Sequence, residues 1–546
     1  MIHTYDILAR TIAQEDPGTC FALLGDANMA LATRLAEEGC GFIYVRHEHC
    51  AVAAAMAHAR KTGGVGLATV TCGPGVTQLM TALPAAVRAH LPLVVLAGEA
   101  PLKAGWYNQA IDQAPFVTAC GAAYVAAHWP ARMPVVIRDA FAQARRELRP
   151  VVVGLPFDLQ ELPWDGPGDL PAPSASLIPA AGPIPPNPDD LSRVAPVVAQ
   201  AGKIVVMAGM GAVESGAGES VHALAQHLDA PTATTLPARG LLHEDPCCLG
   251  VAGGFSPEIA REVMGEADLI IAIGCSLARH NADAGKLWPR ARVLQVDIDP
   301  VSQSQGRLAA DLHLRADARL GAEALVEAVP ARQTRQRGQT LARRIATEPA
   351  DSARFDIAPG QYDPRDVVAA LESALPQGWQ MVNSSGHCSY YFAQMNRPYD
   401  QFLTIREYGA IGNGTSFAMG VAAACRGTPV VLFDGDGSLL MHMQELETYV
   451  RHRLPILTVV LNDGAYGSEI HKLRAEGLSD AGAVFGQTDL AAIARGFGAA
   501  GTRVTDLADL PELVAAFGAD PRPTVLDFPV SDQVVSPVIR RSHGIK

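Results

Sequence analysis

The sequence predicts an α/β protein built from three doubly wound parallel-sheet domains. Short apolar runs, rich in valine, isoleucine and leucine, alternate with alanine-rich helical stretches along the whole chain. Glycine or proline bounds most of these runs, as expected of parallel strands that are buried on both faces. The length of 546 residues also suits about three domains. Sheets of this kind bind ligands at the carboxyl ends of their strands, so residues just after the apolar runs are candidates for chemistry.

Two linker-like stretches predict where the domains meet. Residues 163–190 carry many prolines, which remove backbone donors and block helices. Residues 328–364 are charged and polar. We therefore expect domains at 1–162, 190–328 and 364–546. The predicted strands lie at 20–24, 66–71, 92–98 and 150–156, at 203–209, 268–274 and 292–299, and at 429–436, 455–462 and 523–529.

The composition indicates a folded protein of the cytoplasm. Hydrophobic residues make up 49% of the chain, which argues against disorder, and the formal net charge is −13 without a basic run. A negatively charged protein without a basic patch does not attract negatively charged partners, so we expect neither nucleic acid nor an acidic membrane surface as a partner. No apolar stretch is long enough to span a membrane, and the first residues lack the apolar region of a signal peptide. Ten scattered cysteines, without a C-x-x-C pair, predict free thiols.

Polar residues at two neighbouring strand ends form the strongest chemical signal. One predicted strand runs into the sequence DGDGS, whose second aspartate is Asp436, and the next strand ends at Asn462. A strand–helix–strand unit of this length brings the two strand ends side by side. Asp436, Asn462 and the backbone carbonyl of Gly464 offer oxygen ligands of the kind that magnesium shares with phosphate. For GDG alone, an ordinary Asp-Gly turn is the plain alternative.

This pairing of GDGS with a later asparagine resembles the cofactor signature of thiamine-diphosphate-dependent enzymes. The resemblance implies that Asp436 and Asn462 bind the magnesium ion that anchors the diphosphate, with the Gly464 carbonyl as a third ligand. It also implies phosphate contacts from the helix that we expect to begin near Ser438, since a helix start presents free N–H groups to anions. The residues concerned are Gly435, Gly437 and Ser438.

Glu48 is the predicted catalytic residue. It follows a strand that ends at Val45 and opens an alanine-rich helix, and the sequence RHE before such a helix resembles the catalytic glutamate of the same family. A carboxyl shielded from water keeps a raised pKa and can share a proton with the aminopyrimidine nitrogen of the cofactor. The plain alternative is an acid that favours the first turn of a helix through the helix dipole.

Further segments resemble the family in chain order. The turn at 71–75 and the segment at 112–117, which carries a predicted active-site glutamine at Gln113, belong to a pyrimidine-binding domain. In the third, diphosphate-binding domain, Ile411 matches the apolar residue that props the cofactor into its bent shape, and the Gly409 carbonyl matches the acceptor of its amino group. The remaining predicted cofactor contacts are Gly25, Pro74, Gly386, His387, Cys388 and Tyr466.

The order of pyrimidine, central and diphosphate domains resembles the branch that includes acetolactate synthase, pyruvate oxidase, benzoylformate decarboxylase and the hydroxyacyl-CoA lyases. In that branch the two halves of each site come from different subunits, which implies a homodimer or homotetramer. We favour a carboligase that decarboxylates a 2-oxo acid and adds the enamine to a second carbonyl. The alternatives are a simple 2-oxo acid decarboxylase, a 2-hydroxyacyl-CoA lyase, a flavin-dependent pyruvate oxidase and a cofactor-free relative without activity.

Two features depart from acetolactate synthases. Ser276 and His280 stand where those enzymes carry arginines that neutralise a pyrophosphate, so FAD is doubtful and the central domain is predicted to be a spacer. Histidines are also frequent near the predicted chemistry. Among these histidines, His49 is the predicted proton-transferring residue. The asparagine Asn413 is also expected to face the substrate. The other histidines are His47, His90, His442 and His471.

Overall fold

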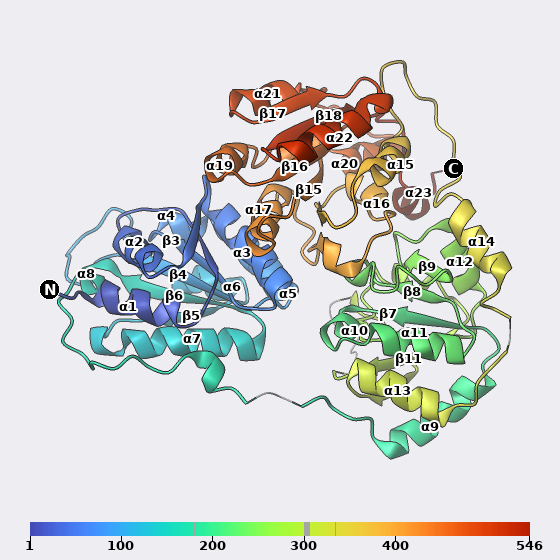
Figure 1. The fold of residues 1–546 in the computed structure, drawn as a ribbon, viewed down its shortest axis with the longest axis horizontal. Coiled ribbons are helices and arrows are strands. Elements are labelled where there is room, and N and C mark those ends of the chain that lie inside the picture. Colours follow the sequence, from blue (N-terminus) through green and yellow to red (C-terminus); the bar gives the residue numbers. More distant parts are fainter. Residues whose placement is uncertain (180–181, 300–305, 334, 546) are drawn as a thin grey trace.

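The computed structural model describes residues 1–179, 182–299, 306–333 and 335–545. It contains three separate sheets of six parallel strands, each covered by helices on both faces (Figure 1). The predicted fold class is therefore confirmed. No helix in these described ranges is long and apolar enough to cross a membrane.

The first sheet has the strand order β2-β1-β3-β4-β6-β5. Its strands are β1 (Thr19–Ala22), β2 (Gly41–Tyr44), β3 (Gly66–Val70), β4 (Leu93–Glu99), β5 (Ala123–Ala126) and β6 (Pro150–Pro156). Its helices are α1 (Thr4–Ala13), α2 (Met29–Glu37), α3 (Glu48–Thr62), α4 (Pro74–Thr77), α5 (Ala82–Arg88), α6 (Ala114–Ala119), α7 (Met133–Glu147) and α8 (Phe157–Gln160).

The central sheet has the order β12-β11-β10-β7-β8-β9, in which the strands run outward from β7 and β10 in both directions. Its strands are β7 (Ile204–Ala208), β8 (Thr232–Thr234), β9 (Cys248–Val251), β10 (Leu269–Ile273), β11 (Arg292–Asp297) and β12 (Leu312–Arg315). Its helices are α9 (Pro188–Gln200), α10 (Met210–Glu214), α11 (Gly218–His227), α12 (Glu258–Gly265), α13 (Ala318–Ala328) and α14 (Gln339–Thr347).

The third sheet, β14-β13-β15-β16-β18-β17, repeats the strand order of the first sheet. Its strands are β13 (Gln380–Asn383), β14 (Phe402–Thr404), β15 (Val430–Gly435), β16 (Ile456–Asn462), β17 (Ala500–Arg503) and β18 (Thr524–Pro529). Its helices are α15 (Pro364–Ala374), α16 (Cys388–Phe392), α17 (Gly414–Ala424), α18 (Asp436–Leu439), α19 (Glu445–His452), α20 (Gly467–Ala475), α21 (Leu490–Gly496), α22 (Leu510–Ala519) and α23 (Pro537–His543).

Two local expectations need correction. The helix expected to begin near Ser438 is a single turn, α18, and the longer helix α19 begins only at Glu445. The second predicted linker, 328–364, contains helix α14, whose Leu341 and Ile345 pack on the core of the central sheet. The first predicted linker, 163–190, contains the short 3-10 turn Ser174–Ser176 and the first residues of α9, and is otherwise without helix where it is described. Residues 180–181 and 334 lie outside the described residues. The predicted domain boundaries stay predictions.

The first and third domains meet along two helices, α3 and α17, which lie side by side in Figure 1. A Cβ on Gly420 of α17 would lie 2.2 Å from the carbonyl oxygen of Ala54 in α3, so only glycine permits this approach. Beside these helices, the carboxylate of Glu445 accepts the backbone N–H of Arg46 at 2.9 Å. This contact fixes the loop before Glu48 against the third domain.

Candidate active site

A cavity lies at the carboxyl ends of β13, β15, β16 and β18, where a doubly wound sheet is expected to bind its ligand. All of its lining residues come from the third domain. They include nine residues that the sequence predicts as cofactor or metal ligands. These are Gly386, His387, Cys388, Ile411, Gly435, Asp436, Gly437, Ser438 and Tyr466.

Asp436 lines this cavity and is only 2% exposed. Its Oδ1 accepts the N–H of Gly437 at 2.9 Å, and its Oδ2 accepts the N–H of Gly464 at 2.8 Å. Burial raises the pKa of Asp436 above its ordinary value, and the two backbone donors offset part of this rise. Burial and the neighbouring Asp436 also raise the pKa of Asp463. Burial and mutual repulsion disfavour the charged forms of these two adjacent carboxyl groups, and a bound cation would stabilise those forms.

Asn462 stands beside Asp436, because Gly435 of β15 pairs with Leu461 of β16 and the next residues follow in register. Its Nδ2 donates to the Thr488 carbonyl at 2.9 Å and to Asp527 Oδ1 at 2.8 Å. Both partners only accept, so the amide has one possible orientation. Its Oδ1 is buried and has no hydrogen-bond partner in the described part of the chain. An oriented oxygen without a partner, next to a carboxylate, fits a magnesium ligand.

Gly464, the third predicted metal ligand, is in a different situation. Its φ of +71° is a left-handed conformation that favours glycine, and its carbonyl accepts the N–H groups of Phe485 and Gly486, both at 2.9 Å. Both lone pairs of the carbonyl are therefore engaged. The role of Gly464 stays a prediction. No cluster of three His, Cys, Asp or Glu side chains placed for a metal occurs among the described residues, so the site depends on Asp436 and Asn462.

The cofactor-binding candidates on the third domain are braced against one another. Ser438 Oγ accepts the N–H of Gly412 at 2.9 Å and lies 3.1 Å from Ser384 Oγ, which joins the GDGS turn to the loop that carries Ile411. A Cβ on Gly437 would lie 2.8 Å from the Tyr466 ring. The first turn therefore stays open to a ligand only with glycine at this position. Gly409, also predicted, is exposed on the same loop with a φ of +71°.

The sequence reasoning missed several lining residues. Asp463 directly follows the predicted ligand Asn462, so its position in the motif could have revealed it. Val530, Ser531 and Val534 line the cavity from the C-terminal segment, which carries no local signal of function. Tyr391 lies in the short helix α16 and reaches the cavity through the tertiary fold.

A second group of predicted residues gathers at the strand ends of the first sheet. Glu48 is the first residue of α3, is half-buried, and has a pKa raised by burial. A Cβ on Gly75, one residue after Pro74, would lie 3.7 Å from Glu48 Oε1. A Cβ on Gly25 would lie 2.7 Å from Thr71 Oγ1, a buried hydroxyl without a partner in the described residues. The turn at 71–75 therefore lies close to both the Glu48 carboxyl and Gly25.

Gln113 supports this turn. Its Oε1 accepts the N–H of Gly73 at 2.8 Å, and its Nε2 donates to the Gly98 carbonyl at 3.1 Å and contacts Tyr124 Oη at 3.3 Å. Through these contacts, the Gln113 side chain positions the loop beside Pro74. The catalytic role of Gln113 stays a prediction.

The histidines separate into two clusters. His49 stacks on His442, with ring centroids 4.9 Å apart, and its Nε2 lies 2.6 Å from Asn413 Oδ1. Burial, together with the neighbouring His442, lowers the pKa of His49 to about 4. These contacts join the first domain to the third with neutral rings, and the proton-transfer role of His49 stays a prediction. His387 and His471 form the other cluster, with centroids 4.7 Å apart.

Family comparisons agree with this architecture. Residues 2–115 match the N-terminal TPP binding domain of thiamine pyrophosphate enzymes, residues 191–325 match the central domain, and residues 384–528 match the C-terminal TPP binding domain. Fold, cavity and family models together define a thiamine pyrophosphate (thiamine diphosphate) enzyme. The chain belongs to this family.

Individual relatives indicate to which branch of the thiamine pyrophosphate enzymes the chain belongs. Acetolactate synthase large subunit from Parasynechococcus marenigrum is 29% identical over 89% of this chain and 80% of its own length. Probable acetolactate synthase 2, chloroplastic, from Oryza sativa subsp. japonica is 30% identical over 92% and 79%. Probable 2-ketoarginine decarboxylase AruI from Pseudomonas aeruginosa is 28% identical over 94% and 91%. These relatives place the chain in the acetolactate synthase branch.

Proposed function

We propose that this enzyme is a carboligase that acts on a 2-oxo acid, with a magnesium ion that anchors the diphosphate of its cofactor. The observation that carries the metal-anchored cofactor is the pair of Asp436 and Asn462 at neighbouring strand ends, with the Asn462 Oδ1 oriented, buried and without a partner among the described residues. The similarity to acetolactate synthases supports carboligation. Magnesium prefers such oxygen ligands and completes its shell with phosphate and water.

The residues of the cavity, together with Asn462 at the neighbouring strand end, would hold the cofactor by its parts. Asp436 and Asn462 would bind the metal, while Gly437, Ser438 and His387 would contact the phosphates and Ile411 would support the ring system. When bound, thiamine diphosphate supplies a nucleophilic carbon and an electron sink for decarboxylation. The chain itself orients these parts and excludes water around them.

Glu48 would move the proton that activates the cofactor. Its carboxyl has a pKa raised by burial, so it exchanges a proton near neutral pH more readily than an ordinary glutamate. The carboxyl oxygen would share this proton with the aminopyrimidine nitrogen. Catalysis by an acid of this kind depends on its distance from the cofactor and on its pKa together.

We further propose a homodimer or a homotetramer as the working form. The cavity is lined by third-domain residues, whereas Glu48, Pro74 and Gly25 gather at the strand ends of the first sheet. A second copy that faces its first domain toward the cavity would complete the site, and symmetry would then create two sites per dimer.

A simple 2-oxo acid decarboxylase is the second candidate. The relative named as a probable 2-ketoarginine decarboxylase is matched over 91% of its length. Decarboxylation is common to both candidates, so they differ only in whether a second carbonyl or a proton captures the product. Ser276 and His280 occupy the positions after β10 where acetolactate synthases carry arginines, and we propose that the reaction proceeds without FAD.

The deciding experiment uses purified protein, thiamine diphosphate, magnesium and a panel of 2-oxo acids, including pyruvate and a guanidino 2-oxo acid. Carbon dioxide and products are followed by mass spectrometry, after a visible spectrum. Acetolactate or another acyloin from a colourless protein supports the carboligase. Aldehyde alone supports the decarboxylase and overturns the carboligase, and a flavin spectrum overturns the flavin-free reaction.

A further inference from the structure

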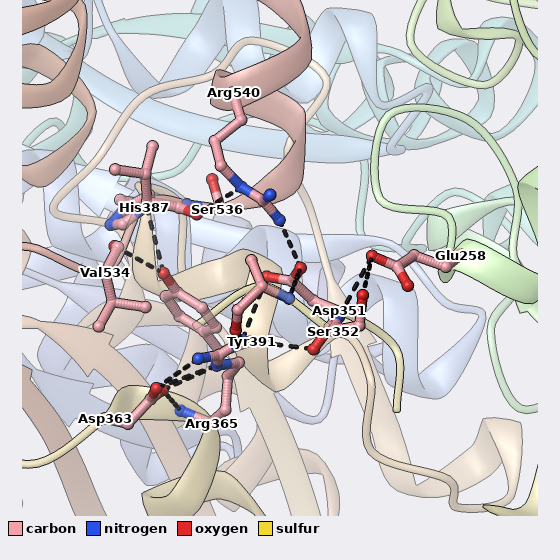
Figure 2. A network of polar contacts seen from close by, with 12 residues as sticks. Glu258, Asp351, Ser352, Asp363, Arg365, His387, Tyr391, Val534, Ser536 and Arg540 are labelled. Atoms are coloured by element: carbon pink, nitrogen blue, oxygen red, sulfur yellow. Dashed lines mark hydrogen bonds and ion pairs between the residues drawn. The ribbon is translucent and has the colours of Figure 1, made fainter. Parts of the chain in front are cut away.

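The C-terminal segment 530–536, here called the strap, forms one wall of the cavity. Val530, Ser531 and Val534 line the cavity, and helix α23 follows directly after Ser536. In Figure 2 the strap residues Val534 and Ser536 lie beside His387 and Tyr391 of the third domain. His387 itself is one of the predicted diphosphate contacts and lines the same cavity.

The strap makes one hydrogen bond that decides the chemical form of His387. The backbone N–H of Ser536 donates to His387 Nε2 at 3.1 Å. A nitrogen that accepts a hydrogen bond carries no proton, so the neutral ring holds its proton on Nδ1. Burial lowers the pKa of His387 well below its ordinary value, and the neighbouring His471 and Lys472 add to this effect, which agrees with a neutral ring.

Tyr391 does not compete for this role. Its hydroxyl donates to the Val534 carbonyl at 3.0 Å, and the same oxygen lies 3.4 Å from His387 Nε2. A phenol has one proton to donate, and the shorter contact uses it. The Ser536 N–H is therefore the donor that sets the tautomer.

His387 Nδ1 lies at the cavity wall. A Cβ on Gly467, the first residue of α20 and a lining residue, would be 3.0 Å from it. In the described part of the chain, no hydrogen bond engages this nitrogen. The Nδ1–H is thus a free donor beside the start of a helix, where phosphate oxygens are favoured.

We propose that the Ser536 backbone N–H is a positioning group for the cofactor: it sets His387 as the Nδ1–H tautomer, which donates to the diphosphate. This inference rests on the proposed function of the cavity. It gives the Ser536 N–H, far from Asp436 in the sequence, a part in diphosphate binding that acts through His387.

The strap is held in place from outside the cavity. Arg540 of α23 pairs with Asp351, which also lies 3.5 Å from Arg365 Nη1, and Arg365 pairs with Asp363 at 2.6 Å (Figure 2). Asp351 is 7% exposed, so these ion pairs are partly desolvated and stronger than surface pairs. The network fixes the start of α23, and with it the Ser536 N–H.

The test compares Ser536→Pro with Ser536→Ala. Proline removes the N–H and tolerates the native φ of −62°, whereas alanine keeps the N–H and removes only a hydroxyl that has no partner in the described residues. Binding of thiamine diphosphate and of thiamine is measured at saturating magnesium by calorimetry. We expect Ser536→Pro to weaken thiamine diphosphate binding about tenfold, or about 1.4 kcal/mol. Thiamine binding, and both affinities of Ser536→Ala, are expected to stay at wild-type values.

Two further measurements keep the inference falsifiable. A His387→Ala background should abolish the effect of Ser536→Pro, and additive losses would overturn the inference. Nitrogen-15 NMR of histidine-labelled wild-type protein should show protonated Nδ1 at His387, and protonated Nε2 would overturn it even where Ser536→Pro fails to fold. Wild-type protein that binds no thiamine diphosphate would instead refute the proposed function, so the two failures are distinguishable.

Discussion

Asn462 owes its candidate role to its neighbours. Thr488 and Asp527 hold its amide nitrogen, so its oxygen points away from them without a protein partner in the described chain. A buried amide oxygen left without a partner costs roughly 1–3 kcal/mol, which a bound cation would recover. The same residue in an ordinary Asn-Asp-Gly turn would face water, so only its surroundings distinguish a ligand from a turn residue.

Asp436→Ala tests the metal assignment. Removal of the Asp436 carboxylate, which lines the cavity, should abolish magnesium-dependent binding of thiamine diphosphate, because magnesium prefers hard anionic oxygen ligands from the protein. Binding is measured by calorimetry with and without magnesium. Asp520→Ala, at a side chain that is 75% exposed, is the matched control. Unchanged affinity of Asp436→Ala would remove Asp436 from the metal site.

Glu48→Gln tests the proton-transfer role. Glutamine preserves size but cannot exchange a proton, so turnover should fall by about 100-fold or more while cofactor binding persists. The rate of carbon dioxide release and the Kd for the cofactor are measured together. Glu37→Gln, on the exposed face of α2, should leave both unchanged. Full turnover by Glu48→Gln would exclude the role.

Asp434 predicts a pH dependence of stability. Burial raises its pKa to about 7 from an ordinary value near 3.8, so the folded state binds this proton more tightly than the unfolded chain. The contribution of protonated Asp434 to the free energy of unfolding is therefore present at low pH and is lost as the pH rises toward 7. Asp434→Asn mimics the protonated form, so its Tm should exceed that of the wild type increasingly between about pH 5 and pH 7. A pH-independent Tm difference would contradict this.

At the level of elements, the ten strands predicted from apolar runs are all interior strands of their sheets, whereas the strand predicted to end at Val45 is the edge strand β2. Edge strands such as β5, β12 and β17 were missed because neighbours on one side only leave them partly exposed, which weakens the apolar pattern. Two interior strands, β8 and β13, were missed because they are short: they are buried but have only three and four residues. A run that short does not stand out from a helix or a loop.

The packing of α3 on α17 has its own prediction. Gly420→Ala would place a methyl group 2.2 Å from the Ala54 carbonyl and 2.7 Å from the Ala57 methyl group. Such overpacking costs about 1–3 kcal/mol and should lower the Tm. Gly496→Ala in α21, where a Cβ meets no heavy atom within 4 Å, should leave the Tm unchanged or slightly raised. Equal Tm values for the two variants would mean that α3 and α17 do not pack this closely.

For the whole molecule, Glu48 is not among the residues that line the third-domain cavity, and the proposed oligomer therefore predicts rescue between inactive variants. If each site takes Glu48 from one copy and Asp436 from another, mixed and reassembled Glu48→Gln and Asp436→Ala should regain up to about a quarter of wild-type activity. Random pairing makes half of the dimers mixed, and each mixed dimer has one intact site.

The matched control mixes Asp436→Ala with Asn462→Ala. Both changes lie in the third domain, so every site keeps one defect and no activity should return. Rescue in the first mixture and silence in the second would support shared sites. Silence in both mixtures, with exchange of subunits demonstrated by native mass spectrometry, would contradict them.

Local patterns were sufficient for the α/β fold and for naming Asp436 and Asn462, because buried strands and the turns after them leave their signal within a few residues. Long-range packing decided the rest. It joined the first domain to the third through His49 and Asn413, and it brought Ser536 to His387 across 149 residues. Contacts of this kind depend on how finished domains pack together, and a backbone N–H leaves no mark on the residue that carries it.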